Sequence, residues 1–495
     1  MHIAVRTDAS AAIGSGHVFR CMALCQALIA VGHRLSLVSL NLPPHLADLL
    51  SKASIRLHPL PDVADAIADA RTTLEILADA PPDWVVVDHY ALGSEWEQII
   101  QARGWPLLAI DDLCRPHQTQ ALLDQTLGRQ VGNYPNPPPL TLLGTDYALL
   151  RPDFYRLREH ARSRTGHALR ILINLGGSDP QALTVPVLKQ VLSWARRTAQ
   201  HGDIQLTVVL PEQAPHFPEV ARLAQDNATQ VVLLGFTADM AGLLATMDLA
   251  VGAPAVSVWE RCVLGVPSVL IPFADNQQDV AHALADAGAA LRVSHSDLTG
   301  LDAALDQTLA QLATQRARVQ QCCDGLGARR TVQHWLPPLA RDGAPVRLQR
   351  MRMADSESLL AWQSAPQTRR YARNPAPPTR AEHNAWMQAR LADPFCYFYR
   401  IDHADQSAGM IRLDRRQPAN PSQAARYEVS ILIAPSHYRL GLAQTALRLL
   451  GELHQEVDIE AVVLPANQAS QHLFEQAGYQ RLADDRFLRP AMAPF

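Results

Sequence analysis

Short, nearly continuous apolar runs alternate with helical patterns over the first 335 residues. Nine of these runs are rich in β-branched residues or leucine, and they lie at 2–8, 33–40, 83–89, 106–112, 168–177, 204–210, 231–236, 248–252 and 267–273. Strands that are apolar on both faces are typical of parallel sheets covered by helices on each side. The pattern therefore predicts an α/β fold with parallel sheets for this part of the chain.

The runs fall into two series, which predict two α/β domains. A proline-rich segment at 134–140 and a basic segment at 158–167 separate the series, because proline and polar clusters interrupt regular elements. We expect an N-terminal domain over 1–158 and a second domain over 159–335. Prolines and a glycine then predict a linker at 336–345.

The pattern changes after residue 346. Helical spacing comes first, at 356–363 and 380–392, and three strand patterns follow, at 396–401, 408–414 and 427–434, before a further helix from about residue 442. Helices and strands that are grouped in this way are typical of an α+β domain. We expect this third domain to span 346–495.

Composition narrows the classes of function. The chain has 495 residues, is 48% hydrophobic and carries a formal net charge of -4, so no basic field points to nucleic acid. No apolar run of 18 residues is free of charged or helix-breaking residues, and the seven cysteines are odd in number and scattered, which is typical of reduced thiols. We expect a cytoplasmic enzyme that acts on small molecules, with no membrane and no nucleic-acid partner.

The first candidate for chemistry is the stretch IGSGHVFRCMALCQAL at 13–28. Gly14 and Gly16 permit positive φ angles and close backbone approach, and an amphipathic helix pattern begins directly after them. His17 would lie where the first strand passes into this helix, at the edge where open α/β sheets bind ligands. A helix N-terminus disfavours an imidazolium, so a histidine here can stay neutral and accept a proton. Position alone, however, favours helix capping or packing over catalysis.

A dinucleotide-binding fingerprint is the competing interpretation of this stretch. Its third glycine position is taken by Phe19, and the second predicted strand, 33–40, ends without the acidic residue that would hold a ribose. The match to that fingerprint therefore fails at two points.

The second α/β series supplies matching polar turns. Asn174, Gly176, Gly177 and Ser178 follow a strand, and we expect them to cap a helix and bind an anion. Further along, Glu260 lies in a predicted helix near a strand end, and Asn276 and Gln277 follow the last strand of the series. Two α/β domains with a polar cleft between them suit a nucleotide-sugar.

These motifs resemble a known family. The matching stretches are RTDASAAIGSGHVFRCMALCQAL, VDHY, IDD, LLDQ, YALLRPDF, NLGGSD, WERCVLGVPS and Asn276–Gln277. Residues 1–335 thus resemble the UDP-sugar hydrolases of pseudaminic acid biosynthesis, the PseG type, whose fold is similar to that of GT-B glycosyltransferases such as MurG. The resemblance implies two Rossmann-like domains and release of UDP from a 2,4-diacetamido-2,4,6-trideoxy-altropyranose.

The resemblance also implies site residues. His17 would activate the attacking water, Tyr90 and Asn276 would line the sugar site, and the region 256–260 with Glu260 would hold UDP. The side chains before the WER sequence depart from the family, since Ala253, Pro254, Ala255 and Val256 leave only Ser257 to offer a hydroxyl. The residues expected to bind the nucleotide-sugar are Gly14, Gly16, Gly177, Ser178, Phe236, Val256, Ser257, Glu260 and Gln277.

Three aspartates at predicted strand ends leave several roles open. Asp88, Asp111 and Asp112 could ligate a metal, act as acids, or cap loops and helices. They lie on separate strands without a supporting cluster of acidic residues in sequence, so we expect no metal. His89 is either a substrate contact or a polar strand-end residue.

Residues 346–490 resemble a GNAT acetyltransferase of the PseH type, which transfers acetyl from acetyl-CoA to the 4-amino group of a UDP-aminosugar. The resemblance is carried by YEVSILIAPSHYRLGLAQTALRLL (427–450) and LPANQASQHLFEQAGYQ (464–480). It implies a turn and a helix start that receive the pyrophosphate of coenzyme A. The spacing is shifted by one, because Tyr438 stands where the usual pattern has a basic residue. The residues expected to bind acetyl-CoA are Arg439, Leu440, Gly441, Leu442, Ala443 and Asn467.

Proton transfers in this domain need other groups than usual. Phe474 replaces the tyrosine that often protonates the departing thiolate, and a phenyl ring cannot donate a proton, which leaves Tyr479, a water, or no acid at all. Glu428 is our candidate for relaying the amine proton through water, with an exposed strand carboxylate as the alternative. The aromatic run 397–399 is expected to lie in the strand core.

The sequence therefore predicts two consecutive enzymes in one chain: a 4-N-acetyltransferase and a UDP-sugar hydrolase. A GT-B glycosyltransferase that passes the sugar to an acceptor is the alternative for the first two domains, because fold does not fix function. A non-catalytic binding module is the alternative for the third. A substrate from a related diamino-sugar pathway is a further alternative.

Overall fold

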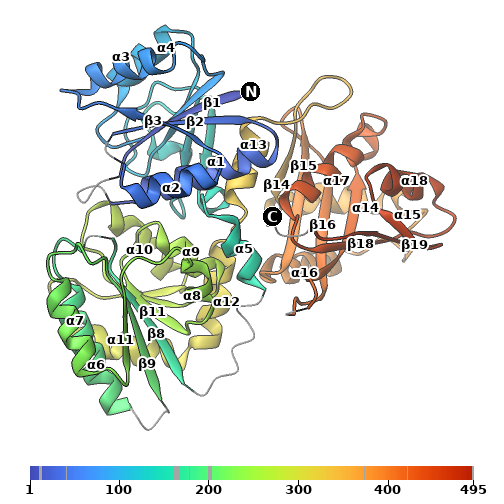
Figure 1. The fold of residues 1–495 in the computed structure, drawn as a ribbon. Helices are drawn as coiled ribbons and strands as arrows, with labels where there is room; N and C mark the ends of the chain where they lie inside the picture. Colours follow the sequence, from blue (N-terminus) through green and yellow to red (C-terminus); the bar gives the residue numbers. More distant parts are fainter. Residues whose placement is uncertain are drawn as a thin grey trace. The chain divides into compact units, whose positions relative to one another are not determined.

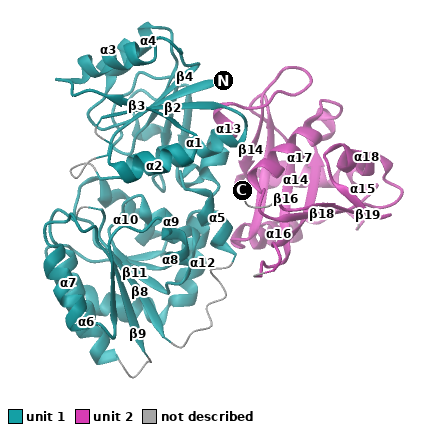
Figure 2. Ribbon diagram, in the orientation of Figure 1, with its two compact units in different colours: residues 1–331 teal, residues 332–495 magenta. Residues whose placement is uncertain are grey.

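The structure of the chain is a computed structural model, which describes residues 1–9, 14–40, 42–159, 168–177, 179–198, 203–372, 374–420 and 422–492 (Figure 1). The chain divides into two compact units, residues 1–331 and 332–495 (Figure 2). The first unit contains two separate parallel sheets, and the second contains one mixed sheet.

The first sheet has seven strands in the order β3-β2-β1-β4-β5-β6-β7, and every neighbouring pair is parallel. Its strands are β1 His2–Thr7, β2 Arg34–Leu40, β3 Arg56–Leu60, β4 Trp84–Asp88, β5 Leu107–Ile110, β6 Ala121–Asp124 and β7 Leu140–Leu143. Its connecting helices are α1 Gly16–Ala30, α2 Pro44–Lys52, α3 Ala66–Ile76 and α4 Ser94–Ala102. The central strand β1 is buried at every residue, as expected for a strand covered on both faces.

The second sheet has six parallel strands in the order β10-β9-β8-β11-β12-β13. Its strands are β8 Leu169–Asn174, β9 Ile204–Val209, β10 Val231–Leu234, β11 Leu249–Gly252, β12 Ser268–Leu270 and β13 Ala290–Arg292. Its helices are α6 Thr184–Thr198, α7 Phe217–Asp226, α8 Met240–Ala245, α9 Ser257–Val263, α10 Asn276–Asp286, α11 Leu301–Ala310, α12 Leu312–Cys322 and α13 Gly327–Trp335.

The chain passes from the first sheet to the second along helix α5, Pro152–Arg158. Phe154 packs against apolar side chains of the second sheet and its helices. Buried Arg158 donates hydrogen bonds to the backbone carbonyls of Val263, Gln320 and Cys323. These bonds satisfy a buried guanidinium that would otherwise be costly to bury. Helix α5 is thereby fixed to the second half.

The second unit contains a seven-stranded sheet in the order β14-β15-β16-β17-β18-β20-β19. Its pairs are antiparallel except β17 with β18, which run parallel. The strands are β14 Val346–Arg350, β15 Cys396–His403, β16 Gln406–Gln417, β17 Arg426–Ile433, β18 Asp458–Val462, β19 Gln480–Ala483 and β20 Arg486–Arg489. The helices are α14 Ser356–Ser364, α15 Pro366–Arg369, α16 Arg380–Ala392, α17 Leu442–Leu453 and α18 Gln468–Gln476.

The predicted elements are present, but strand β14 precedes the helices that were expected to come first in the last domain. All nine apolar runs of the first unit contain strands, and the three strands and two early helices predicted for the last domain are present. The aromatic run 397–399 is buried in β15, as predicted. The proline-rich segment 134–140 does not end the first domain, because β7 begins at Leu140 and pairs with β6.

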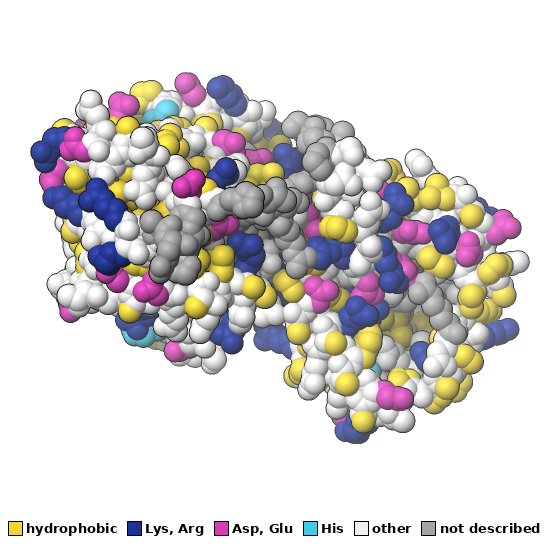
Figure 3. Space-filling model, turned by 90° about the horizontal axis from the view of Figure 1, so that it is seen from below, with side chains coloured by type: hydrophobic (Ala, Val, Ile, Leu, Met, Phe, Trp, Pro, Cys, Tyr) yellow, Lys and Arg dark blue, Asp and Glu magenta, His cyan; other side chains and the backbone are white. Residues whose placement is uncertain are grey.

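Surface and composition add three observations. Basic and acidic side chains are interspersed among the described residues that face the viewer in Figure 3. None of the described helices combines the length and apolarity needed to cross a bilayer. The seven cysteines form no disulfide in the described structure, and five of them are buried.

Candidate active site

The first candidate site lies where β1 and β4 end. The strand order reverses between these neighbours, so the connections that follow them leave toward opposite faces and open a place for a ligand. Thr7 pairs with Asp88 at the ends of the two strands. Side chains that follow β1 and β4 are therefore brought together although they are more than 70 residues apart in sequence.

The turn after β1 sets the position of His17. Gly14 has a φ of +78°, a conformation that other residues adopt at a cost. Helix α1 then begins at Gly16, and the N-cap residue Ser15 makes no side-chain capping hydrogen bond. His17 thus lies in the first helical turn, as the sequence predicts.

His17 is almost fully buried, with 6% of its surface exposed, yet polar groups surround it. Its ring meets that of Tyr90 edge-on, with centroids 4.7 Å apart. Its Nδ1 lies 3.9 Å from Asp88 Oδ1, and no described residue gives Nδ1 a hydrogen bond. Burial lowers the pKa of His17; the charge of Arg20 lowers it further, while those of Asp88 and Asp112 oppose this. A histidine with a lowered pKa is neutral at neutral pH and can accept a proton.

Arg20, three residues beyond His17 on helix α1, joins two of the aspartates. Its guanidinium donates to both oxygens of Asp88, at 2.6 and 2.7 Å, and to Asp112 Oδ2 at 3.0 Å. Asp88 also accepts a hydrogen bond from the thiol of Cys21. Both Arg20 and Asp88 are buried, so their charges are compensated within the protein.

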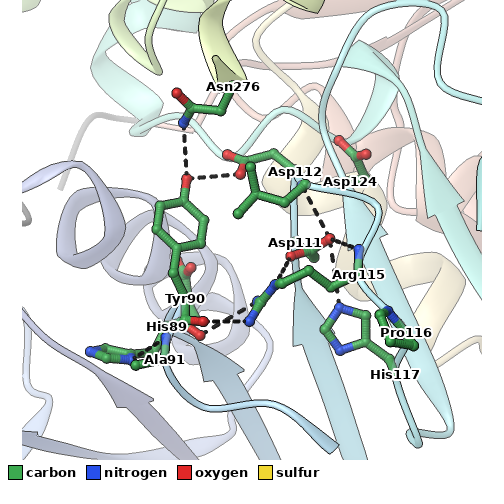
Figure 4. A network of polar contacts seen from close by, with 12 residues as sticks. His89, Tyr90, Ala91, Asp111, Asp112, Arg115, Pro116, His117, Asp124 and Asn276 are labelled. Atoms are coloured by element: carbon green, nitrogen blue, oxygen red, sulfur yellow. Dashed lines mark hydrogen bonds and ion pairs between the residues drawn. The ribbon is translucent and has the colours of Figure 1, made fainter. Parts of the chain in front are cut away.

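Tyr90 links the two halves of the first unit (Figure 4). Its hydroxyl donates to Asp112 Oδ1 at 2.8 Å and accepts a hydrogen bond from Asn276 Nδ2 at 3.3 Å. Asn276 is the first residue of helix α10. The geometry thus brings together His17, Tyr90 and Asn276, which the resemblance had placed in one site.

Neighbouring carboxylates form hydrogen bonds and ion pairs with other groups of the protein. Asp111 accepts hydrogen bonds from the backbone N–H groups of Leu113 and Arg115 and from the Arg115 side chain. Burial raises the pKa of its carboxyl, but His117 and Arg115 outweigh this and lower the pKa below its ordinary value. His89 lies 3.3 Å from Asp8 and accepts a bond from the backbone N–H of Ala91. Among the described residues no group of three metal-ligating side chains gathers. These contacts tie Asp111 to the loop that follows β5 and His89 to Asp8.

The turn after β8 differs from its predicted form. Gly176 has a φ of +103° and Gly177 follows it, whereas Ser178 lies outside the described residues. Helix α6 begins only at Thr184, and Asp179, rather than Ser178, accepts hydrogen bonds from the backbone N–H groups of Leu183 and Thr184. The prediction that Asn174, Gly176 and Gly177 cap this helix is wrong, because the Asp179 carboxylate takes these donors. The part of the prediction that concerns Ser178 lies outside the described residues.

The other residues predicted to hold the nucleotide-sugar lie partly on the side of the second half that faces the first. A side chain at Gly16 would approach the Val256 methyl group to 3.6 Å, and the exposed ring of Phe236 stacks obliquely on that of His45, with centroids 4.9 Å apart. Ser257 begins helix α9, and Gln277 accepts a hydrogen bond from the backbone N–H of Phe273. Val256 and Phe236 thus contact the first half.

Glu260 of helix α9 has an unusual charge state. Burial raises the pKa of its carboxyl to about 7, although the charges of Arg151 and Arg261 oppose this. At neutral pH the carboxyl is therefore partly protonated, and it can both donate and accept hydrogen bonds.

The predicted acetyl-CoA loop lies between β17 and α17. Arg439 has a φ of +72° and Gly441 a φ of +78°, and helix α17 begins at Leu442, with Ala443 following in its first turn. Arg341 supports the loop, since its backbone N–H donates to the carbonyl of Leu440. Two left-handed residues in this short turn let the backbone reach the helix start despite the shifted spacing.

The residues predicted to transfer protons in the second unit have different surroundings. Glu428 on β17 accepts two hydrogen bonds from the Arg416 guanidinium, at 2.5 and 2.9 Å. Tyr479 is buried beside Phe474 with ring centroids 5.1 Å apart, and no described residue pairs with its hydroxyl. Burial raises the pKa of Tyr479. Asn467 caps helix α18 by accepting a bond from the backbone N–H of Ser470.

Sequence reasoning missed Arg20 and Asp179. Arg20 interrupts the apolar face of a helix four residues after Gly16, and a charge in that place was a signal for a buried ion pair. Asp179 completes the NLGGSD motif, and aspartate is a preferred capping residue. Their partners lie too far away in sequence to be read locally, apart from the two amides that Asp179 caps.

Two family models match parts of the chain. Residues 171–325 match the glycosyltransferase family 28 C-terminal domain, and residues 346–480 match the acetyltransferase (GNAT) domain. Both matches agree with the sheets observed in these regions and confirm the predicted fold class.

Individual relatives match the first unit. The spore coat polysaccharide biosynthesis protein SpsG of Bacillus subtilis is 32% identical over 155 residues, 31% of this chain and 44% of that protein. The UDP-2,4-diacetamido-2,4,6-trideoxy-beta-L-altropyranose hydrolase of Campylobacter jejuni is 24% identical over 195 residues, 39% of this chain and 66% of that protein. The chain thus spans about half to two thirds of the length of these relatives.

A solved structure, MurG of Acinetobacter baumannii, aligns over 67% of this chain and 98% of its own, with 19% identity and a TM-score of 0.49. One chain thus contains a region similar to the C-terminal domain of family 28 glycosyltransferases and, after it, a region similar to GNAT acetyltransferases, and part of it is similar to a UDP-sugar hydrolase.

Proposed function

We propose that the chain is a bifunctional enzyme of pseudaminic acid biosynthesis. Its first unit hydrolyses UDP-2,4-diacetamido-2,4,6-trideoxy-β-L-altropyranose to UDP and the free sugar, and its second unit acetylates the 4-amino group of the UDP-sugar precursor. The observation that carries this proposal is the meeting of His17, Tyr90 and Asn276, which come from both halves of the first unit.

In the hydrolytic step, water attacks the anomeric carbon from the face opposite UDP. His17 takes a proton from this water while the bond to the UDP oxygen breaks, so the configuration at the anomeric carbon inverts. A neutral imidazole is suited to this step, because a base must be deprotonated before the reaction. Tyr90 lies beside His17, and Asn276 contacts Tyr90; both are proposed to contact the sugar.

The nucleotide is proposed to lie on the second half. Gly177, Ser178, Phe236, Val256, Ser257 and Gln277 supply its surroundings, and the turn amides bind phosphate oxygens. Glu260, whose pKa is near 7, is proposed to bind a hydroxyl of the nucleotide by donating or accepting a hydrogen bond. Gly14 and Gly16 carry no side chains, which keeps the turn between β1 and α1 small.

In the acetyl-transfer step, the sugar amine attacks the thioester carbonyl of acetyl-CoA and coenzyme A leaves as the thiolate. The Arg439–Ala443 segment is proposed to receive the pyrophosphate, and Asn467 the pantetheine arm. Glu428 is proposed to take the amine proton through water, and its bonds to Arg416 hold the carboxylate in place. Acetyl-CoA is a cosubstrate here, and small molecules are the proposed partners of both units.

The two activities would follow one another. The acetylated UDP-sugar is the product of the second unit and the substrate of the first, and covalent linkage raises the local concentration of each site near the other. The full-length protein is tested with the UDP-4-amino sugar and acetyl-CoA, and mass spectrometry follows the products. The acetylated UDP-sugar should appear first and the free sugar afterwards.

A GT-B glycosyltransferase is the second candidate for the first unit, and the family 28 match favours it. An incubation without any acceptor distinguishes the two functions. A hydrolase releases UDP and free sugar in equal amounts, whereas a transferase leaves the UDP-sugar intact until an acceptor is added. For the second unit, acetyl-CoA that binds without being consumed would indicate a non-catalytic module.

A further inference from the structure

A cluster of three charged side chains, Arg20, Asp88 and Asp112, lies next to His17. Arg20 and Asp88 are buried, and Asp112 has 18% of its side chain exposed. Arg20 holds both oxygens of Asp88 at 2.6 and 2.7 Å, and its remaining nitrogen reaches only one oxygen of Asp112, at 3.0 Å. One guanidinium therefore faces two carboxylates. The cluster carries one excess negative charge, and the geometry places it on Asp112.

His17 lies at the edge of this cluster. The charged and titratable groups that face it are Arg20 from α1, Asp88 and His89 from the end of β4, Asp112 from the end of β5, and Tyr90. Asn276 of α10 is uncharged and contacts Tyr90. With a neutral imidazole this surrounding is negative by one charge, and the uptake of one proton by His17 brings it to zero.

We propose that Asp112 is a positioning residue that drives proton uptake by His17, an inference that rests on the proposed role of His17 as the proton acceptor. Burial keeps the imidazole neutral before the reaction, whereas the excess charge of Asp112 stabilises the imidazolium once the proton has moved. An interaction that exists only after proton transfer lowers the barrier without stabilising the resting state. The same carboxylate accepts a hydrogen bond from the Tyr90 hydroxyl, so the Tyr90 oxygen can accept a hydrogen bond from Asn276.

The test is the titration of the His17 ring, followed by NMR in the full-length protein without substrate. A His17→Gln variant identifies the signal. Asp112→Asn removes the charge but leaves Arg20 paired with Asp88, so no buried charge loses its only partner and we expect the variant to fold. The midpoint of the His17 titration should move to lower pH by roughly 0.5 to 1 unit, as for loss of a nearby opposite charge.

Tyr90→Phe is the matched control, because it removes the hydrogen bond to Asp112 and keeps the carboxylate. Its His17 midpoint should stay with that of the wild type. The proposal is overturned if Asp112→Asn leaves the midpoint unchanged or raises it, or if Tyr90→Phe moves it equally. Should Asp112→Asn fail to fold, Asp112→Ser carries the same expectation.

A second readout is the pH dependence of kcat/KM for UDP release. In Asp112→Asn its acidic limb should move to lower pH in parallel with the NMR midpoint, and kcat should fall about three- to tenfold, because one pKa unit is a tenfold change in proton affinity. If the wild type releases no UDP, the proposed hydrolase function fails, while the titration still decides the electrostatic role of Asp112. The two failures are therefore separate.

Discussion

The imidazole of His17 and the phenol ring of Tyr90 meet edge-on with their centroids 4.7 Å apart. One residue follows β1 and the other follows β4, and these strands are neighbours at the point where the strand order reverses. The contact is therefore a consequence of the sheet topology. It places the buried imidazole of His17 beside the residue that reaches Asn276 of the second half.

The first prediction concerns the pH dependence of UDP release. Burial lowers the pKa of His17 below its ordinary value of 6.5, so the base stays deprotonated down to a lower pH than a solvent-exposed histidine would. We expect the acidic limb of kcat/KM to lie below pH 6.5, because kcat/KM reports the free enzyme. An acidic limb above that value would contradict the assignment of His17.

A second prediction concerns stability and His117. Burial lowers the pKa of His117, but the nearby Asp111 carboxylate and the hydrogen bond to Glu97 outweigh this and raise the pKa to about 9. The folded protein therefore binds this proton more tightly than the unfolded chain does. The stabilisation is fully present below about pH 6.5 and is lost as the pH rises to about 9, at a cost of about 1–3 kcal/mol.

Urea unfolding across this pH range measures the effect. His117→Gln should remove most of the loss between neutral and alkaline pH. The exposed His282 offers a matched control, and His282→Gln should retain the wild-type dependence. Equal slopes in the wild type and in His117→Gln would refute this explanation.

The acetyl-CoA loop gives a third prediction. Gly441 has a φ of +78°, and a Cβ there would lie 3.2 Å from the Arg341 side chain. Gly441→Ala should destabilise the protein by about 1–2 kcal/mol and raise the KM for acetyl-CoA severalfold. Gly478→Ala is the control, since Gly478 has a φ of +82° with open space around it. Gly478→Ala should lower the stability by a similar amount without changing the KM for acetyl-CoA. An unchanged KM in Gly441→Ala would argue against a role of this loop in acetyl-CoA binding.

A fourth prediction concerns Tyr479. Its hydroxyl is buried, and no described residue bonds to it, so its removal relieves an unsatisfied polar group. Tyr479→Phe should leave acetyl transfer within about twofold of the wild type and raise the free energy of unfolding by about 0.5–1 kcal/mol. A loss of acetyl transfer of about a hundredfold or more would instead identify Tyr479 as the acid.

Strands that lie in the nine apolar runs could be predicted from sequence, and several other short strands could not. The strands β3, β6, β7 and β13 have three to five residues each, β3 contains Pro59, and β7 follows a proline-rich segment. Such strands form because neighbouring strands offer hydrogen-bonding partners, which is information that a local pattern lacks. Their absence from the predicted fold did not affect its class.

Part of the candidate site could also be predicted from sequence. The glycines before His17 and the end of an apolar run before Tyr90 mark the two turns, because backbone freedom and strand ends have local signatures. The bonds of Arg20 to Asp88 and Asp112 join residues 68 and 92 positions apart. Only the folded sheet brings these charges together, so the electrostatic setting of His17 could not be predicted from sequence.

The central claim is that the first unit hydrolyses a UDP-sugar with His17 as the base. The most direct measurement is UDP release from UDP-2,4-diacetamido-2,4,6-trideoxy-β-L-altropyranose without an acceptor, for the wild type and for His17→Gln. We expect equal amounts of UDP and free sugar from the wild type, and a rate lower by about 10²- to 10⁴-fold in the variant. An intact UDP-sugar in the wild-type reaction, or a variant as fast as the wild type, would contradict the account.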